Sequence, residues 1–435
     1  MPAMAPRTCT PDEAAGLVRP RDSIGFGLGP ANPHAFLTAL GDRDDWEDLV
    51  LGGALLLGLY TVLTRPGVSY RCGFFGPVER AFKDQGAAIE LVPGGFRQFA
   101  PILARYAPRI VTVQAAPPDA GGKINLSLHY GGLRDELLAA GRDPDRLLLV
   151  EINPNLPRTS TLAPFDNTLP LDLVDVLVEA DGLPFELPDA APSPVDDAIT
   201  SHALAYVTDG STLQTGIGGV PNLVASRLAT GPGGGYGIHS EMFTNGLMRL
   251  HRAGRVSNDV KGIYDGVSVT TFALGSADLY RWLDGNPEVA FLPVETVNDP
   301  SVIGRNHALV SINGALSIDL YGQVVADCIG GRQISGVGGH EDFVAGADLA
   351  PDATSLICLP ATATVGGELH SRIVPLLPEG SVVATPRHHT HTVVTEHGSA
   401  DLTGLTVRER AHALVEIAHP DFRAGLREAA DTLGH

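Results

Sequence analysis

The chain has 435 residues, a formal net charge of -20 at pH 7 and 44% hydrophobic residues. This length exceeds one ordinary domain and predicts two, each large enough to bury a core. The negative charge argues against nucleic-acid and anionic-membrane partners, because both would be repelled at long range. A small anionic ligand is still allowed, since helix N-termini and a few Arg side chains bind phosphates locally.

The lack of recognisable targeting signals and the scattered cysteines predict a soluble cytoplasmic protein. No apolar run approaches the ~18 residues that a membrane-spanning helix needs. Residues 1–12 are Pro-rich and lack the apolar core of a secretory signal. The 4 cysteines are scattered without a CxxC pair, which argues against a disulfide framework and a zinc site.

Short β-rich runs alternate with helical stretches along the chain, a pattern that predicts an α/β architecture. The clearest elements are strands at residues 147–152, 267–272 and 355–359 and helices at residues 35–40 and 223–228. The best domain boundary is the Pro-rich, acidic and aperiodic segment 182–195. It divides the chain into an N-terminal domain, residues 1–190, and a C-terminal domain, residues 195–435.

Both predicted domains begin with the same local pattern. Residues 22–29 and 210–219 each resemble a strand that runs into a glycine turn, and a helix follows near Pro33 and Pro221. The similarity favours two tandem related domains.

The second glycine turn is a candidate anion site. Missing side chains let backbone N–H groups approach a ligand, and the following helix N-terminus favours an anion such as pyrophosphate. A tight turn without a ligand is the alternative, and the glycine spacing is not the dinucleotide fingerprint. The residues of this turn are Gly216, Ile217, Gly218, Gly219 and Val220.

A second glycine cluster lies at residues 335–343, with the sequence SGVGGHEDF. Consecutive glycines before a helix can direct N–H groups inward as an oxyanion hole, which acyl chemistry needs. Gly338 and Gly339 are the candidates in this cluster. A simple bend between two elements is the alternative.

Glu241 is the candidate nucleophile. It lies in residues 237–246, GIHSEMFTNG, among apolar and small residues between a predicted strand and a predicted helix. A surface helix would place its acids on a solvated face, whereas this carboxylate is placed at the mouth of an α/β sheet. His239 either lines the same site or makes a structural hydrogen bond.

Several segments resemble the acetyl-CoA hydrolase/transferase family, whose members include 4-hydroxybutyrate, butyrate and succinate CoA-transferases. The resemblance covers nearly all of residues 210–426 and is thinner in the first half. The segments are 151–159 (EINPNLPRT), 297–300 (VNDP), 310–324 (VSINGALSIDLYGQV), 393–402 (VVTEHGSADL), 408–411 (RERA) and 417–423 (IAHPDFR).

The resemblance implies two CoA-transferase-type α/β domains with the active site between them and a ping-pong reaction. It places the catalytic roles on Glu241 as nucleophile, Gly339 as oxyanion glycine, and Asn298 and Glu396 as further site residues. Two nearby carboxylates raise the pKa of one of them, so Glu396 is expected to carry a proton during part of the cycle. Coenzyme A contacts fall on the 216–220 turn, on Gly338 and on Leu316.

One departure from the family concerns coenzyme A. Where members commonly have Ser-Thr-Ala-Lys, residues 361–364 have the sequence ATAT, so Thr364 stands where a lysine is expected. We therefore expect coenzyme A to be held more by backbone groups and by Arg372 or Arg387. No metal is expected; the run 387–391, RHHTH, is not interpreted as a metal site because neighbouring His side chains face different ways.

Three functions remain open from the sequence. The first is an acyl-CoA:carboxylate CoA-transferase that passes through acyl-glutamyl anhydride and glutamyl-CoA thioester intermediates. The second is an acyl-CoA hydrolase that uses the same glutamate, and the third is a non-catalytic CoA-binding protein. The expected partners are acyl-CoA and small carboxylic acids, and a homo-oligomer, a dimer or larger, is expected.

Overall fold

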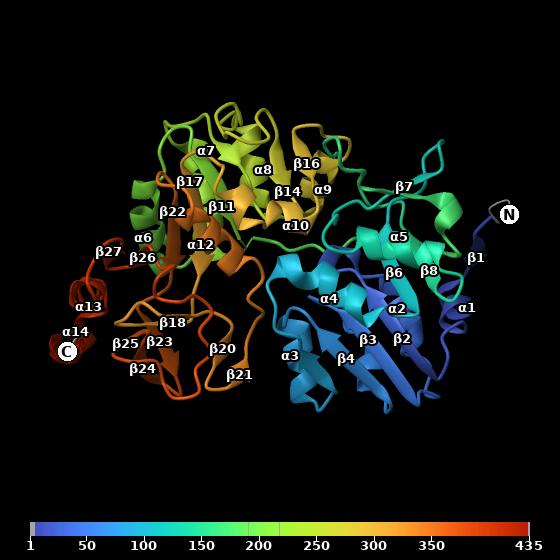
Figure 1. The fold of residues 1–435 in the computed structure, drawn as a ribbon, viewed down its shortest axis with the longest axis horizontal. Helices are drawn as coiled ribbons and strands as arrows, with labels where there is room; N and C mark the ends of the chain where they lie inside the picture. Colours follow the sequence, from blue (N-terminus) through green and yellow to red (C-terminus); the bar gives the residue numbers. More distant parts are fainter. Residues whose placement is uncertain (1–4, 190, 217, 434–435) are drawn as a thin grey trace. The chain divides into compact units, whose positions relative to one another are not determined.

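The structure is a computed structural model that describes residues 5–189, 191–216 and 218–433. The chain forms two compact units, each labelled by its elements in Figure 1. Unit 1 comprises Met1–Leu187 and Val269–Val297, and unit 2 comprises Pro188–Ser268 and Asn298–His435. The junction after Leu187 lies within the predicted boundary segment 182–195.

Residues 269–297 belong to unit 1, whereas the sequence placed them in the C-terminal domain. Backbone hydrogen bonds explain the difference. The N–H of Ala273 donates to the carbonyl oxygen of Leu128 at 2.8 Å, and that of Phe291 donates to the carbonyl oxygen of Ser160 at 2.8 Å. These bonds join residues far apart in the sequence, so no local pattern reveals them.

Unit 1 is built on an eight-stranded sheet in the order β1-β10-β8-β6-β2-β3-β4-β5, and every neighbouring pair is parallel. The strands are β1 (Arg7–Cys9), β2 (Arg21–Phe26), β3 (Asp48–Gly53), β4 (Val68–Cys72), β5 (Ile89–Leu91), β6 (Ile110–Ala115), β8 (Leu147–Ile152) and β10 (Val176–Glu179). Outside this sheet lie β7 (Lys123–Asn125), β9 (Thr168–Pro170), β14 (Ser268–Thr270), β15 (Phe272–Ala273) and β16 (Val289–Phe291). The helices are α1 (Pro11–Ala15), α2 (His34–Leu40), α3 (Pro77–Asp84), α4 (Phe99–Tyr106), α5 (Arg134–Arg142), α9 (Ala277–Leu283) and α10 (Val294–Val297).

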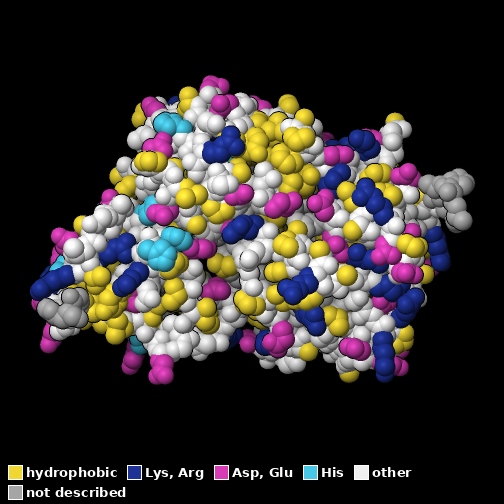
Figure 2. Space-filling model, in the orientation of Figure 1, with side chains coloured by type: hydrophobic (Ala, Val, Ile, Leu, Met, Phe, Trp, Pro, Cys, Tyr) yellow, Lys and Arg dark blue, Asp and Glu magenta, His cyan; other side chains and the backbone are white. Residues whose placement is uncertain are grey.

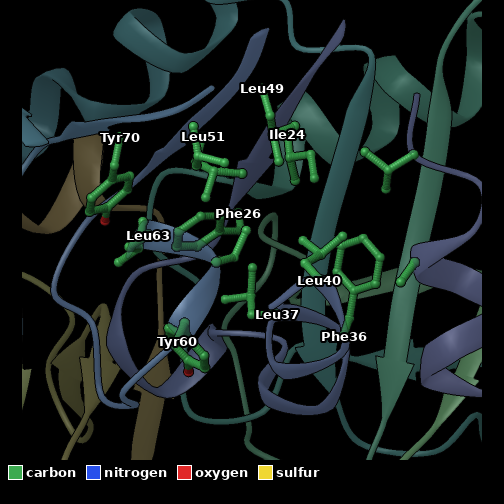
Figure 3. Close-up of a cluster of buried hydrophobic side chains, with 14 of the residues drawn as sticks. Ile24, Phe26, Phe36, Leu37, Leu40, Leu49, Leu51, Tyr60, Leu63 and Tyr70 are labelled. Carbon is green, nitrogen blue, oxygen red and sulfur yellow. The ribbon is translucent and has the colours of Figure 1, made fainter. Parts of the chain in front are cut away.

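The core of unit 1 follows from the two-residue period of its strands. Ile24 and Phe26 of β2 and Leu49 and Leu51 of β3 point to one face of the sheet, where they meet the apolar side of α2 (Figure 3). Gly53 allows this packing, because a Cβ there would lie 2.4 Å from Cε2 of Phe26. The cluster is contiguous, and it holds α2 against the sheet.

Unit 2 is built on a six-stranded sheet in the order β12-β11-β17-β22-β26-β27, parallel except for the final β26–β27 hairpin. These strands are β11 (Thr212–Thr215), β12 (Gly237–Ile238), β17 (Leu309–Gly314), β22 (Thr354–Cys358), β26 (Thr392–Thr395) and β27 (Gly398–Asp401). The shorter strands are β13 (Met242–Phe243), β18 (Ser317–Asp319), β19 (Val324–Val325), β20 (Cys328–Ile329), β21 (Arg332–Gln333), β23 (Thr362–Val365), β24 (Glu368–Ser371) and β25 (Ile373–Val374). The helices are α6 (Pro194–Ala203), α7 (Gly219–Thr230), α8 (Asn245–Arg252), α11 (Pro300–Ile303), α12 (His340–Asp348), α13 (Val407–Glu416) and α14 (Pro420–Thr432).

The α/β prediction is confirmed, and several predicted elements coincide with observed ones. Residues 147–152 form β8, and the repeated strand, glycine turn and helix appear as β2 to α2 and β11 to α7. The predicted strand 267–272 is instead broken between β14 and β15. The carbonyl oxygen of Thr271 accepts the N–H groups of Tyr130 and Gly131, at 3.0 and 3.2 Å, so this residue bonds outside both short strands.

The described residues show mixed surface charge (Figure 2) and buried cysteines. On the face shown in Figure 2, acidic and basic side chains are interspersed and no broad basic patch is visible. No helix among the described residues is long and apolar enough to cross a membrane. The cysteines Cys9, Cys72, Cys328 and Cys358 are all buried and unpaired by disulfides.

Replacing Phe36 tests the core of unit 1. The ring is fully buried, so Phe36→Ala should lower the free energy of unfolding by about 3–5 kcal/mol, since a cavity replaces the ring. Urea unfolding followed by tryptophan fluorescence measures this, because Trp46 and Trp282 both lie in unit 1. Leu59, whose side chain is 74% exposed, provides the control: Leu59→Ala should change stability by less than about 0.5 kcal/mol. An equal loss in both variants would contradict the assignment of the core.

Candidate active site

The carboxyl edge of the unit 2 sheet gathers most of the predicted site segments. The strands β12, β11, β17, β22 and β26 are parallel neighbours, so their carboxyl ends lie on one edge. Ligands of open α/β sheets bind outside this edge. The segments that leave it carry Glu241 after β12, the 216–220 turn after β11, Leu316 after β17, Thr364 after β22 and Glu396 after β26.

The backbone on either side of Glu241 is tied to β11. The N–H of His239 donates to the carbonyl oxygen of Leu213 at 3.1 Å. The hydroxyl of Ser240 accepts the N–H of Thr215 at 3.3 Å and lies 2.9 Å from the carbonyl oxygen of Met242. These contacts fix the segment between β12 and β13, and α8 begins at Asn245 just beyond it.

The Glu241 carboxylate lies against Asn298 and Gly339. Nδ2 of Asn298 donates to Oε2 of Glu241 at 2.6 Å, and Asn298 is fully buried. A Cβ on Gly339 would lie 2.0 Å from Oε2 of Glu241 and 2.3 Å from Nδ2 of Asn298. Position 339 therefore accepts only glycine while the carboxylate and the amide stay where they are. Three residues far apart in the sequence thus form one compact polar cluster.

The electrostatics of this cluster raise the pKa of Glu241 from 4.5 to about 7. Burial is the largest cause, because it disfavours the charged form. The hydrogen bond from Asn298 lowers the pKa, and the negative charge of Asp342 raises it. The carboxylate is thus more basic than an ordinary glutamate and is still substantially ionised near neutral pH, as a nucleophile requires.

Gly338 and Gly339 precede α12 beside the carboxylate. Gly338 has a φ of +57°, a conformation that favours glycine, and Gly339 is the N-cap residue of α12. The first N–H groups of a helix have no partners within the helix and carry partial positive charge. The glycine cluster therefore brings a helix N-terminus to the carboxyl group of Glu241.

The glycine turn before α7 is a predicted anion site, and its residue Ile217 lies outside the described residues. Gly218 has a φ of +126° and, as N-cap residue, offers no side chain to the first N–H groups of α7. Gly219 lies close to the Asp196 carboxyl group, because a Cβ there would be 2.6 Å from its Cγ. Gly216 and Gly218 remain accessible to solvent, while Val220 is buried in the helix.

Glu396 lies on the same edge but away from Glu241, because it follows β26, and three strands separate β26 from β12. Its Oε2 accepts the N–H of Ala361 at 2.8 Å, which ties the segment after β22 to the β26–β27 turn. Its charge also acts on Arg372, whose pKa is lowered by burial and raised in part by Glu396. Glu396 is thus grouped with Ala361 and Arg372 in its described contacts.

Leu316 and Thr364 are both accessible to a ligand. Leu316 connects β17 to β18, where its N–H donates to the carbonyl oxygen of Val325 at 2.8 Å. Thr364 is exposed on the β23–β24 hairpin and pairs with Leu369 across it. Both positions follow strands of the main sheet and present solvent-accessible surface.

The His-containing segments form hydrogen bonds to protein groups. His239 is buried and its Nδ1 lies 3.1 Å from Nδ2 of Asn306, in line with the structural alternative for this residue. His389 bonds to Glu341 at 2.6 Å, and His391 bonds to Asp348 at 3.0 Å. Within the described ranges, no group of three or more His, Cys, Asp or Glu side chains is arranged to hold a metal ion.

Asp342 is a site residue that the sequence did not single out. It is 6% exposed, and its Oδ2 lies 3.3 Å from the same Asn298 nitrogen that contacts Glu241. In the sequence it is one of two acids in the first turn of a helix, a position where acids commonly stabilise the helix end. The only local signal for Asp342 is its position three residues after Gly339.

Known proteins resemble this chain over nearly its whole length. The sequence profile of the acetyl-CoA hydrolase/transferase C-terminal domain matches residues 275–430. A probable butyrate:acetyl-CoA coenzyme A-transferase of Syntrophomonas wolfei is 33% identical, with 98% of this chain and 95% of that protein covered. A succinyl-CoA:cyclohexane-1-carboxylate CoA transferase of Geobacter metallireducens is 35% identical over the same shares. The crystal structure of RipA from Yersinia pestis matches with a TM-score of 0.87 at 33% identity, covering 98% of this chain and 97% of RipA.

A parallel α/β fold matched from end to end by such proteins defines an enzyme of the CoA-transferase class. The chain belongs to the acetyl-CoA hydrolase/transferase family. The family resemblance seen in the sequence motifs and the prediction of an enzyme are both confirmed.

Gly339→Ala tests whether the glycine is required by the carboxylate. The added Cβ has to displace Glu241 or Asn298, and a misplacement of about 1 Å costs about 10²-fold in rate. Steady-state acyl exchange from acyl-CoA measures the loss. Gly425 lies in α14, where an added Cβ would meet nothing within 4 Å, so Gly425→Ala should keep the full rate. Undiminished exchange by Gly339→Ala would contradict the described geometry.

Proposed function

We propose that the chain is an acyl-CoA:carboxylate CoA-transferase with Glu241 as its nucleophile. The observation that carries the proposal is the Glu241 carboxylate held at 2.6 Å by Asn298 against a position that admits only glycine. The relatives in Syntrophomonas wolfei and Geobacter metallireducens, both named as CoA-transferases, support the reaction class.

In the first half-reaction, a Glu241 oxygen attacks the acyl-CoA carbonyl carbon. The C–S bond breaks, coenzyme A leaves as a thiolate, and an acyl-glutamyl anhydride remains. The thiolate then attacks Cδ of Glu241 and releases the donor acid as a carboxylate. This leaves a glutamyl-CoA thioester and splits one difficult exchange into two easier steps.

The second half-reaction runs in reverse with the acceptor acid. Its carboxylate attacks Cδ of the glutamyl thioester and expels the coenzyme A thiolate, which forms a new mixed anhydride. The thiolate attacks the acyl carbon of that anhydride, so the new acyl-CoA departs and the Glu241 carboxylate is regenerated. Atoms and charge balance without any group beyond the two substrates.

The pKa of Glu241, about 7, supports this chemistry. A more basic carboxylate is a better nucleophile, and at neutral pH a large fraction of it is still ionised. We propose that the backbone N–H groups at Gly339 and the Asn298 amide stabilise the oxyanions of both anhydride and thioester steps. We further propose that Glu396 orients the incoming acid.

Coenzyme A is proposed to bind along the carboxyl edge of the unit 2 sheet. Its phosphates would interact with the N-terminus of α7 at the 216–220 turn, where the N-cap residue Gly218 has no side chain of its own to cap the first N–H groups. Leu316 would offer an apolar contact for the pantetheine arm, and Gly338 would let that arm approach the backbone closely. Because residue 364 is a threonine, no lysine at this position would contact the nucleotide end of coenzyme A.

Hydrolysis is the second candidate function. The family description includes acetyl-CoA hydrolases, and Glu241 is partly exposed to solvent. Water would attack Cδ of the same glutamyl thioester in place of the acceptor acid. Transfer and hydrolysis thus share the nucleophile and differ in whether the active site excludes water once the acyl-CoA is bound.

Acyl exchange with trapping of the intermediate tests the proposed function. Acetyl-, butyryl- and succinyl-CoA are offered with and without acetate, and free thiol and new acyl-CoA are measured separately. We expect acceptor-dependent exchange, a borohydride-reducible thioester at Glu241, and loss of both in Glu241→Gln. The rate should fall as the pH drops below about 7, because the protonated Glu241 carboxyl group is not a nucleophile. Thiol release independent of acetate would favour the hydrolase, and exchange retained by Glu241→Gln would exclude both.

Thr364→Lys tests the missing positive charge. A lysine on the exposed hairpin should lower KM for acyl-CoA by up to about fivefold at low salt and leave kcat unchanged, since an exposed ion pair contributes up to about 1 kcal/mol. Val365, the next residue of β23, points to the opposite face of the hairpin and is 62% exposed. Val365→Lys adds the same charge as a control. An identical change in both variants, or none in either, would contradict a specific contact at position 364.

A further inference from the structure

The Asn298 amide lies between two carboxylates. Its Nδ2 is 2.6 Å from Oε2 of Glu241 and 3.3 Å from Oδ2 of Asp342. An amide nitrogen carries two N–H groups, so it can donate one to each acid at the same time. The nitrogen thereby connects the proposed nucleophile to a second buried acid on α12.

We propose that Asp342 is a positioning residue whose carboxylate orients the Asn298 amide toward Glu241 throughout the catalytic cycle. The inference rests on the proposed function of Glu241. It adds a residue that does not itself touch the reacting atoms and acts through Asn298.

The oxygen side of the amide supports this role for Asp342. Oδ1 of Asn298 is buried and, within the described residues, has no hydrogen-bond partner. The amide orientation is therefore held from its nitrogen side, by Glu241 and Asp342. If the amide were rotated by half a turn, Oδ1 would face two carboxylates and be repelled by both.

The contribution of Asp342 becomes decisive when Glu241 is acylated. In the anhydride and the thioester, Glu241 carries no negative charge and holds the amide less strongly. Asp342 still accepts one N–H of Asn298 and keeps the other directed at the glutamyl group. The oxyanion donor is then already in place for the second attack and needs no reorientation.

Close packing of α11 and α12 fixes the distance between Asn298 and Asp342. Asn298 lies one residue before the N-cap of α11, Asp299, which accepts the N–H of Ser301 at 2.8 Å. A Cβ on Gly346 of α12 would lie 2.3 Å from Cγ2 of Ile303 in α11. The two helices are thus in direct contact beside the site, and Asp342 is 6% exposed at the start of α12.

Several other ionisable groups on α12, on β22 that packs against it, and on α8 are neutral or have partners of their own. Cys358 of β22 is neutral, because burial raises its pKa to about 12. Asp348 at the end of α12 bonds to His391 at 3.0 Å. Arg249 of α8 pairs with Asp189 at 2.6 Å.

The nearby histidines are also accounted for. His239 bonds to Asn306, and its ring packs edge-on against Phe343 with the ring centroids 6.1 Å apart. His340 bonds to Thr385 at 2.8 Å, and burial lowers its pKa to about 4, so it is neutral at pH 7. Asp342 is a charged side chain that raises the pKa of Glu241.

Glu341 provides a matched control on the same helix turn. It is the other acid in the first turn of α12, but its oxygens bond to Thr385 at 2.9 Å and His389 at 2.6 Å. Glu341→Gln and Asp342→Asn each remove one negative charge from the same helix end. Only Asp342→Asn also removes the charge that faces Asn298.

The experiment compares the pH profiles of kcat/KM for acyl exchange in the full-length wild type, Asp342→Asn and Glu341→Gln. We expect Asp342→Asn to move the acid limb about one unit lower, because Glu241 loses a neighbouring negative charge. We also expect kcat to fall at least tenfold, whereas Glu341→Gln should leave the limb in place. Adding Asp342→Asn to Asn298→Ala should cost little further rate, since Asp342 acts through Asn298. An unmoved limb, or fully additive losses, would overturn the proposal.

A second measurement separates this inference from the proposed function. Difference infrared spectra of each protein against its own Glu241→Gln version report the ionisation of Glu241 without any turnover. If Asp342→Asn shifts this titration but no thioester can be trapped in the wild type, the proposed function fails and the electrostatic coupling between the two acids stands. If the thioester forms and neither the titration nor kcat responds to Asp342→Asn, the positioning role fails alone. Circular dichroism of every variant at pH 7 excludes a loss of fold as the cause.

Discussion

The contact between Glu241 and Asn298 is the interaction on which the site of this enzyme depends. A carboxylate partly removed from water is costly unless a donor compensates it, and the 2.6 Å hydrogen bond from Asn298 provides that compensation. The compensation is partial, because burial still raises the pKa of Glu241 to about 7. In the proposed mechanism, the remaining excess basicity makes the side chain a useful nucleophile at neutral pH.

Glycines determine how close the surrounding elements come to this carboxylate. Gly339 brings the start of α12 against Glu241, and Gly346 brings α12 against α11, which follows Asn298. Both approaches exclude a side chain on the glycine. The rigidity of the site therefore comes from backbone packing, and the polar side chains are held by elements that leave them little room to move.

A parallel sheet explains why chemistry from distant parts of the chain meets in unit 2. Each strand of the order β12-β11-β17-β22-β26 delivers its following segment to the same edge. The edge is long, however, and its ends have different surroundings. Glu241 at one end contacts Asn298, whereas Glu396 near the other contacts the N–H of Ala361.

The sequence by itself determined the α/β class, the family, the glycine turns and Glu241 as an acid in an apolar setting, because periodicity and local composition encode these features. Only the tertiary structure decided that residues 269–297 belong to unit 1 and that Asp342 shares the Asn298 amide with Glu241. Glu241 and Asn298 are 57 positions apart in the chain, and Asn298 and Asp342 are 44 apart. Contacts at such separations depend on strand order and helix packing, which no local pattern of residues records.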